Sequence, residues 1–442
     1  MDMNKRIEAA LKAVGITIWR ITEVQEQSAE LFFVKKQLDT RRSKDTLKYK
    51  VAVFREEEKD GKPMKGSTEV TLLPSVSDEQ MKKALADAYF AAQFALNPGC
   101  RQPKAEQEPF IASKTKLSAT GLEEACGIMA QAAFRADCHK ASYINSFEIF
   151  AYRSAQHIWS SEGTDVSWDS TWMDGEYVVQ CKKPEDVELF YLFAYDDLEP
   201  DTLYQKMKAS LDHVYDRAAA EPIVKTGTYD VILADDDLST LFQFQGQRSN
   251  AQAVVAGYST WKIGDDVQHK EEEGEALSLT LKSHVPFSFD GIRMKELQMM
   301  KDGKLAGYWG NNRFCQYIGI EPTGYYDTLS VDNPGTMTLD DMKKQVEITG
   351  RPILLPVLFS DFNIDPFSGN FGGEIRLGYL YDGKSVRPFT GCAMNGNILE
   401  AQKTIRFSKE RHKKYTTNVA FGDQCYEGPY AALLQNISVM GK

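Results

Sequence analysis

Two stretches with a two-residue period decide the fold: Phe147-Glu-Ile-Phe-Ala-Tyr152 and Val166-Ser-Trp-Asp-Ser-Thr-Trp-Met173. Successive side chains of a β-strand point to opposite faces, so this period is typical of strands with one buried face. The same period recurs at 157–161, 176–181 and 189–194. Residues 142–197 are therefore predicted to form an antiparallel meander.

Helices and further strands precede and follow this meander. Apolar residues spaced by one helical turn predict helices over 4–14 and 201–220. Ser77 and Thr120 each begin a capping pattern, which predicts helices that end near residues 96 and 135. Earlier strands are expected at 16–24, 30–36, 47–54 and 67–73. The helix over 201–220 must end near the residue before Pro222, so we expect a domain boundary there.

The second half of the chain is predicted to be rich in strands. A strand over 229–233 leads into an acidic helix start at 235–237, where negative charge suits a helix N-terminus. Another helix is expected over 338–348, and strands are expected at 276–281, 293–300, 305–309, 326–331, 353–359, 374–381 and 432–439. The predicted class is α+β, with mostly antiparallel sheet and a few helices in two domains, residues 1–221 and 222–442.

Composition excludes several classes of protein. Lys and Arg number 52 against 63 Asp and Glu, a formal charge of −11, which argues against coating of nucleic acid or of an anionic membrane. The start of the chain has no apolar signal segment, and no apolar run approaches the roughly 20 residues of a membrane span. The seven cysteines form no CxxC pair, which favours reduced thiols in a cytoplasm.

Motifs for metal binding or catalysis are absent from the sequence. No two of the six histidines lie within ten residues of each other, whereas a helical zinc peptidase needs two His about one turn apart beside a Glu. The sequence also lacks GxSxG, a P-loop and GxGxxG. We therefore predict no catalytic residue and no metal ligand from spacing alone.

Cys425 is the one thiol kept as a candidate site residue. It lies in Gly422-Asp-Gln-Cys-Tyr-Glu-Gly-Pro429, which is interpreted as a polar turn before a strand. A thiol in a polar turn is expected to be more accessible, and so more reactive, than a thiol in a core.

An ordered series of segments in the second half resembles the TldD/PmbA family, which carries the label "modulator of DNA gyrase" and is related to metallopeptidases. The series begins with Phe287-Ser-Phe-Asp-Gly-Ile292 and Lys301-Asp-Gly-Lys-Leu305. It continues through the group 311–319, Thr323-Gly324, Asn333-Pro-Gly335 with 338–342, Asp365-Pro-Phe-Ser-Gly-Asn-Phe371, 382–384 and 396–399. In the first half, Ser160-Ser-Glu-Gly163 resembles the end of a strand in the family, and this similarity is weaker than those of the second half.

The resemblance implies which branch of the family this chain is similar to. The TldD branch carries HExxxH on a helix early in its second domain and uses a later Cys as a further zinc ligand. The PmbA branch, also called TldE, lacks the histidines and pairs with TldD in a peptidase that acts on unstructured peptides. The corresponding helix here, Leu241-Phe-Gln-Phe-Gln-Gly-Gln-Arg248, contains no His and no Glu, and Cys425 stands where the late Cys falls.

Three hypotheses about function follow from the resemblance. The leading one is a cytoplasmic PmbA/TldE-like subunit that binds no cofactor itself and pairs with a TldD-like, HExxxH-bearing chain that holds zinc. The second is a homodimeric protein that binds peptides without catalysis. The third is a self-sufficient hydrolase that uses Cys425 or an unrecognised metal site. Neither nucleic acid nor a membrane is an expected partner.

Overall fold

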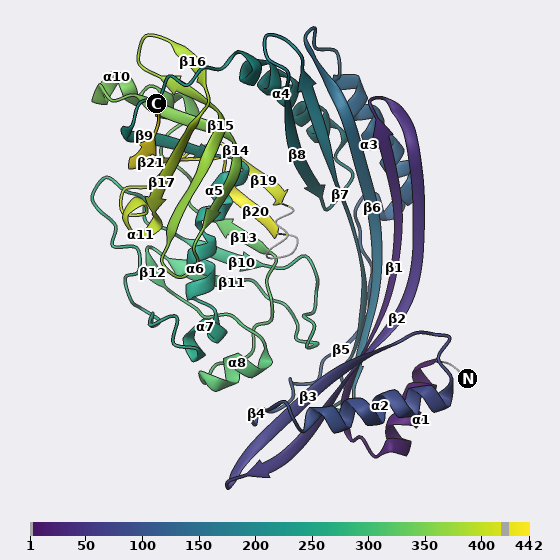
Figure 1. Cartoon of the computed structure of the whole chain (residues 1–442). Helices are drawn as coiled ribbons and strands as arrows, with labels where there is room; N and C mark the ends of the chain where they lie inside the picture. The colour runs from purple at the N-terminus through teal and green to yellow at the C-terminus, as the bar shows by residue number, and fades with distance from the viewer. Residues whose placement is uncertain (1–2, 417–423) are drawn as a thin grey trace.

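Long antiparallel strands form one side of the molecule in the computed structural model, which describes residues 3–416 and 424–442 (Figure 1). They lie in the order β8-β7-β6-β1-β2-β3, with β4 beside β3, while β5 pairs in parallel with β7. The predicted meander is therefore confirmed in β6, β7 and β8. The strands of this part of the sheet are β1 (Ile18–Val34), β2 (Gln37–Lys59), β3 (Lys62–Leu72), β4 (Leu96–Pro98), β5 (Gln107–Ile111), β6 (Ser142–Ser160), β7 (Asp165–Cys181) and β8 (Val187–Tyr195).

The strands are longer than the sequence pattern predicted. The stretches expected at 16–24 and 30–36 are parts of the single strand β1, and the five stretches of the meander form three strands. Polar residues interrupt the apolar pattern between these stretches, but the backbone pairing continues through them. A gap in the pattern therefore marked a change of environment along one strand, not its end.

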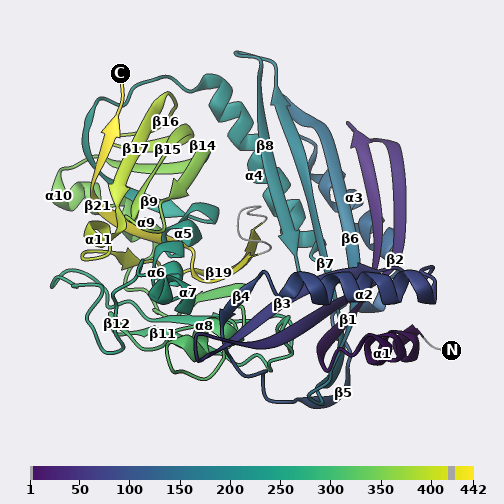
Figure 2. The ribbon, with the colours of Figure 1, turned by 60° about the horizontal axis from the view of Figure 1, so that its bottom comes forward.

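Four helices and a short 3₁₀ turn cover one face of these strands. In Figure 1, α3 and α4 lie behind β6, β7 and β8, and Figure 2 shows α1 and α2 side by side across the other end of the sheet. Both ends of the sheet bury apolar side chains against these helices, for example Met129 of α3 and Leu11 of α1. The helices are α1 (Met3–Val14), α2 (Asp78–Ala92), η1 (Leu117–Ala119), α3 (Leu122–Ala136) and α4 (Pro200–Ala219).

Only one of the two capping patterns predicted in this half is formed. The Ser77 hydroxyl accepts from the Gln80 amide at 3.2 Å, and the Gln80 side chain accepts in return from the Ser77 amide. Helix α3 instead begins after Gly121 without a side-chain cap. The Thr120 hydroxyl instead donates to the Lys116 carbonyl at 2.9 Å, at the start of η1.

The second half contains a separate mixed sheet in the order β14-β9-β21-β17-β15-β16, with β18 beside β21. Its core joins apolar residues of the sheet to those of the short helices α5 and α6, such as Leu241 and Phe244. The strands of this sheet are β9 (Gly227–Ala234), β14 (Ile353–Ile364), β15 (Asn370–Tyr381), β16 (Val386–Phe389), β17 (Cys392–Asn397), β18 (Arg406–Phe407) and β21 (Ala431–Met440).

Short strands of the second half continue the long sheet of the first. They extend it beyond β8 in the order β19-β20-β13-β10-β11-β12, and the two parts are joined through the pair Tyr415 and Ala194. These strands are β10 (Leu279–Lys282), β11 (Leu297–Lys301), β12 (Lys304–Leu305), β13 (Thr328–Val331), β19 (Arg411–Thr416) and β20 (Gln424–Pro429). One sheet thus contains strands from both halves of the chain.

Short helices complete the second half. The Thr338 capping box is formed, since the Thr338 hydroxyl accepts from the Asp341 amide at 3.0 Å. These helices are α5 (Asp236–Leu241), α6 (Gln243–Arg248), α7 (Ala251–Val255), α8 (Asn312–Tyr317), α9 (Leu339–Lys343), α10 (Gln345–Thr349) and α11 (Ile398–Ala401).

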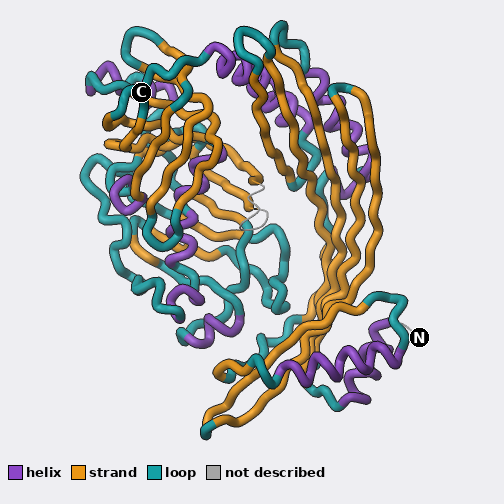
Figure 3. The backbone as a smooth tube through the Cα atoms, viewed as in Figure 1, coloured by secondary structure: helices purple, strands orange, loops and turns teal. Residues whose placement is uncertain are grey.

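The fold is α+β and mostly sheet, as predicted (Figure 3). Glu221 and Pro222, the expected domain boundary, lie in the segment between α4 and β9. Within residues 3–416 and 424–442, no helix has the length and apolar character needed to cross a membrane.

Candidate functional site

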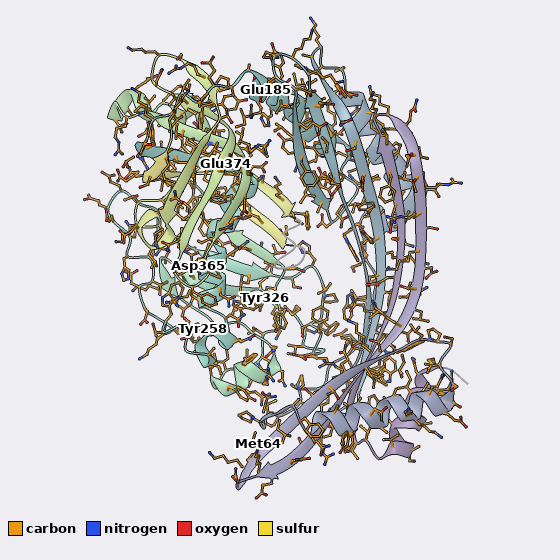
Figure 4. The ribbon with its side chains drawn as sticks, in the orientation of Figure 1. Met64, Glu185, Tyr258, Tyr326, Asp365 and Glu374 are labelled. Carbon is orange, nitrogen blue, oxygen red and sulfur yellow. The ribbon has the colours of Figure 1, made fainter. Side chains whose placement is uncertain are left out.

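A cavity of about 260 Å³ lies between helices α5 and α6 and the strands β10, β13 and β20. Phe242, Gln243 and Gln247 contribute one wall. The other walls include Leu281, Trp309, Tyr325, Tyr326, Asp327, Thr328, Cys425 and Tyr426. Tyr326 is labelled in Figure 4, near the short strands of the second half. The cavity thus gathers the helix that the family resemblance singled out and the candidate thiol.

Helices α5 and α6 form one wall of the cavity, which we call the helix wall. It begins one residue after Asp235, a strained residue that follows β9. Asp235 has φ +56° and ψ −125°, a conformation that side chains with a Cβ rarely adopt. Its amide donates to the Tyr430 carbonyl at 2.9 Å, and its carboxylate lies 2.8 Å from Lys414 Nζ and 3.6 Å from His412 Nδ1. These contacts hold the sharp turn that directs α5 and α6 over the cavity.

Charge also fixes the ionisation of Asp235. Burial acts to raise the pKa of this carboxyl group, but the charges of Lys414, Lys206 and His412 and the hydrogen bond from Lys414 together lower it more, so that the net pKa is about 2. The carboxylate is therefore ionised at neutral pH and is bound in an ion pair.

Helix α6 presents amides, not metal ligands, to the cavity. Gln243 and Gln247 lie one turn apart and both line it, and Phe242 precedes them. Gln245 points elsewhere, because its side chain donates to Gln402 Oε1 at 2.9 Å in a buried pair. The side chains that α6 turns toward the cavity are therefore neutral.

Cys425 is less accessible than the sequence predicted. Its segment is not a polar turn but strand β20, paired on one side with β13 and on the other with β19. The residue is only 3% exposed, and burial raises the pKa of its thiol to about 12 although the Lys413 ammonium lowers it. Gly422 and Asp423 of the predicted turn lie outside the described residues. The thiol is protonated at neutral pH, so it is a poor nucleophile.

A hydrogen-bonded polar cluster adjoins the cavity and was not predicted. His284 Nδ1 lies 3.0 Å from Asp327 Oδ1, and His284 Nε2 lies 2.7 Å from the Tyr415 hydroxyl. Asp196, from the end of β8, lies 3.8 Å from His284 Nε2 and accepts from Lys413 Nζ at 2.8 Å. The pairing of β8 with β19, together with the pairings that join β19 through β20 and β13 to β10, brings these residues together, so no spacing in the sequence could have indicated them.

Two groups of the cluster have pKa values that are shifted in opposite directions. Burial, followed by the hydrogen bond to Asp196, raises the pKa of Tyr415 far above its ordinary value. Burial acts to raise the pKa of Asp196 too, but the hydrogen bonds from Lys413 and Tyr415 and the charges of Lys413 and His284 together lower it more, so the net pKa is below its usual range. At neutral pH the cluster therefore contains a neutral Tyr415 and an ionised Asp196.

The residues at the cavity do not fit a catalytic metal. A catalytic zinc site needs about three protein ligands of the His, Cys, Asp or Glu type, and the described side chains of the helix wall are a hydroxyl, two amides and an aromatic ring. Over the described ranges, no group of three or more His, Cys, Asp or Glu side chains is placed to hold an ion. We therefore derive no catalytic step through a metal on this chain.

The cavity lies in the part of the chain that matches the model of a known protein family. Residues 226–441 match the family model described as PmbA/TldA metallopeptidase C-terminal domain. A search of curated protein sequences finds no match. The matched segment contains every residue that lines the cavity.

Three solved structures share the fold over the whole chain. A proposed modulator of DNA gyrase from Thermotoga maritima has a TM-score of 0.76 at 15% identity and covers 99% of each chain. TldE from Thermococcus kodakarensis has a TM-score of 0.75 at 15% identity, covering 99% of this chain and 100% of its own. A proposed modulator of DNA gyrase from Bacteroides thetaiotaomicron has a TM-score of 0.76 at 14% identity, with full coverage of both chains. At such identities the similarity establishes the fold.

Proposed function

Because the chain belongs to the TldD/PmbA family of metallopeptidase-related proteins, we propose that it is a PmbA/TldE-like subunit of a TldD-type peptidase. In this proposal the complex acts on unstructured peptides, and a TldD-like partner carries the HExxxH motif. The partner holds the zinc that activates water for hydrolysis. This chain contributes peptide binding and no metal ligand.

The observation that carries the proposal is the chemistry of the cavity. Gln243 and Gln247 take the helix wall, and the buried Cys425 thiol is protonated, so the family's ligand set is replaced by neutral groups. The cavity itself persists, with aromatic side chains and amide groups that suit binding of a peptide. A cavity that has no set of metal ligands among its described residues but is lined by aromatic and amide groups favours a role in peptide binding.

The open face of the long sheet supports association with another chain. Phe32 and Phe150 lie 5.4 Å apart between ring centroids, and Tyr152 stacks on Trp172 at 5.0 Å. On β8 of the same face, Phe190 is 51% exposed. An apolar patch of this kind is typical of protein–protein contact, which supports a dimer with the partner or with a second copy.

We also propose that the complex works in the cytoplasm. All seven cysteines are free thiols, including the buried Cys126 and Cys181. Structural disulfides are common in oxidising compartments and rare in the cytosol, which supports this location.

The test is co-expression of this chain with an HExxxH-bearing family member from the same source. We expect a stable complex that cleaves unstructured peptides, loses activity with a chelator and regains it with zinc. The isolated chain should not cleave the same peptides. Absence of a complex, together with a chelator-insensitive activity of the isolated chain, would contradict the proposal.

Two other functions predict different results. A homodimeric peptide-binding protein would bind peptides equally well with and without chelator and would form no complex with an HExxxH-bearing chain. A hydrolase that uses Cys425 would lose peptide cleavage in Cys425→Ala. The burial and high pKa of this thiol speak against the latter.

A further inference from the structure

The rings that line the cavity have their polar atoms bound elsewhere. Trp309 Nε1 donates to the Gly246 carbonyl at 2.8 Å, and the Tyr326 hydroxyl donates to the Lys295 carbonyl at 3.0 Å. Tyr325 and Tyr326 meet Trp309 edge to face, with ring centroids 6.0 and 6.4 Å from it. The surface left for a ligand at this wall is therefore mainly aromatic.

The charge at the cavity has one sign. Of the described residues that line it, Asp327 is the one with a charged side chain. The nearby ammonium groups are neutralised, since Lys282 Nζ lies 2.6 Å from Glu427 Oε2 and Lys413 Nζ lies 2.8 Å from Asp196 Oδ2. The Asp327 carboxylate accepts hydrogen bonds from the His284 amide and the Thr328 hydroxyl and lies 3.0 Å from His284 Nδ1, and its side chain stays 32% exposed. Among the described residues, no ammonium or guanidinium group pairs with it, so it would attract a cation and repel an anionic ligand.

Size limits the ligand to a single side chain. A volume of about 260 Å³ is below the range typical of sites for drug-sized molecules, about 300–1,000 Å³. Gln243 and Gln247 add amide oxygens that can accept hydrogen bonds from an ammonium or guanidinium group. An aliphatic side chain would also fill the space, but it would bring no positive charge to the Asp327 carboxylate and no donor to the amide oxygens of Gln243 and Gln247.

We propose that this cavity receives one cationic side chain, lysine or arginine, of an extended peptide. Trp309 and the two tyrosines contact the cation through their ring faces, and Asp327 provides the opposite charge. The proposal rests on the proposed function, because it specifies which peptides this subunit binds. It gives the subunit a role in choosing the substrate while the partner performs hydrolysis.

The test measures binding of blocked tripeptides to the isolated chain by calorimetry at pH 8 and low salt. The peptides are acetyl-Gly-Xaa-Gly-amide, in which Xaa is lysine, arginine, norleucine or glutamate. Lysine and arginine should bind at least about tenfold more tightly than norleucine, equivalent to about 1.4 kcal/mol, and glutamate should bind most weakly. Equal binding of norleucine and lysine would overturn the proposal, as would the absence of binding by any of the peptides.

Two variants locate the preference in the cavity. Asp327→Asn should reduce the ratio between the lysine and norleucine peptides to about threefold or less. Gln247→Lys places a cation in the cavity without truncating a side chain, and it should abolish binding of the lysine peptide. An unchanged preference in both folded variants would show that the cation binds elsewhere and would overturn the proposal.

Matched controls separate these effects from general changes of charge or surface. Asp201→Asn removes an exposed carboxylate of α4, and Tyr215→Leu removes a ring that is 42% exposed, the same fraction as Tyr325. Both controls should keep the preference, whereas Tyr325→Leu should weaken the lysine peptide by about threefold or more. Cleavage by the complex with an HExxxH-bearing chain is scored separately. If the isolated chain shows no preference for cationic peptides, the complex can still cleave peptides, and only the inference about the cavity fails. If no complex forms, the isolated chain can still prefer cationic peptides, and only the proposed function fails.

Discussion

The strained residue at the start of the helix wall allows a prediction with an unusual sign. Asp235 has a left-handed φ of +56° between β9 and α5. We compare Asp235→Ala with Asp235→Gly, because both variants lose the ion pair with Lys414 and differ only in the presence of Cβ. The difference between their free energies of unfolding therefore isolates the strain of the backbone from the loss of the charge.

The two contributions to this difference oppose each other. A residue with a Cβ pays on the order of 1–3 kcal/mol in a sparsely populated region such as φ +56°, ψ −125°, and glycine avoids most of this cost. Glycine in turn loses about 0.4–1 kcal/mol because its unfolded chain is more flexible. We therefore expect the glycine variant to be about 1 kcal/mol more stable than the alanine variant, although alanine is the more stabilising residue at most positions.

The assay is urea unfolding followed by near-UV circular dichroism, with equal m values required so that the midpoints report stability. The control is Ala234→Gly, one residue earlier in β9, where the backbone is extended and glycine should destabilise by about 0.5–1 kcal/mol. If Asp235→Ala is as stable as Asp235→Gly, the turn is not strained and the reasoning is wrong.

Three further predictions concern the thiols, the polar cluster and the long sheet. Cys425 should resist iodoacetamide at pH 8 while the exposed Cys138 is alkylated, as followed by peptide mass spectrometry, because burial raises the pKa of Cys425 to about 12. The folded pKa of Asp196 is lowered, so its stabilisation is present at neutral pH and is lost as the pH falls below about 4. Lys413→Ala should flatten this acid-side loss in unfolding measurements, and an unchanged slope would contradict the ion pair. Gly175→Ala should cost about 1–3 kcal/mol in thermal unfolding, since its Cβ would overlap a carbonyl oxygen of β6 and the Phe193 ring.

The sequence predicted the elements of the fold better than their extent. The two-residue period identified β6, β7 and β8, and the capping boxes at Ser77 and Thr338 marked the starts of two helices. The pattern divided β1 in two because it reports burial, and burial changes along a strand that is covered by helices only at its ends. The short strands β16 to β20 were missed, since they are polar and their pairing is set by distant residues.

The candidate site was only partly accessible from sequence. The helix wall and Cys425 were identified through the family resemblance, and both line the cavity. The accessibility predicted for Cys425 was wrong, because a polar segment can form a central strand when its neighbours in the sheet supply the burial. His284 and Asp196 come from different halves of the chain, so their contact required the shared sheet.

The position of β21 means that the sheet of the second half cannot be completed until this strand has been synthesised. This strand, Ala431–Met440, is formed from residues near the end of the sequence, yet it lies between β9 and β17 in the middle of its sheet. During synthesis β9 and β17 leave the ribosome with open edges that wait for it, and such edges readily pair with other chains. A chain truncated before residue 431 would therefore be expected to aggregate, because β9 and β17 would lack the strand that pairs with both.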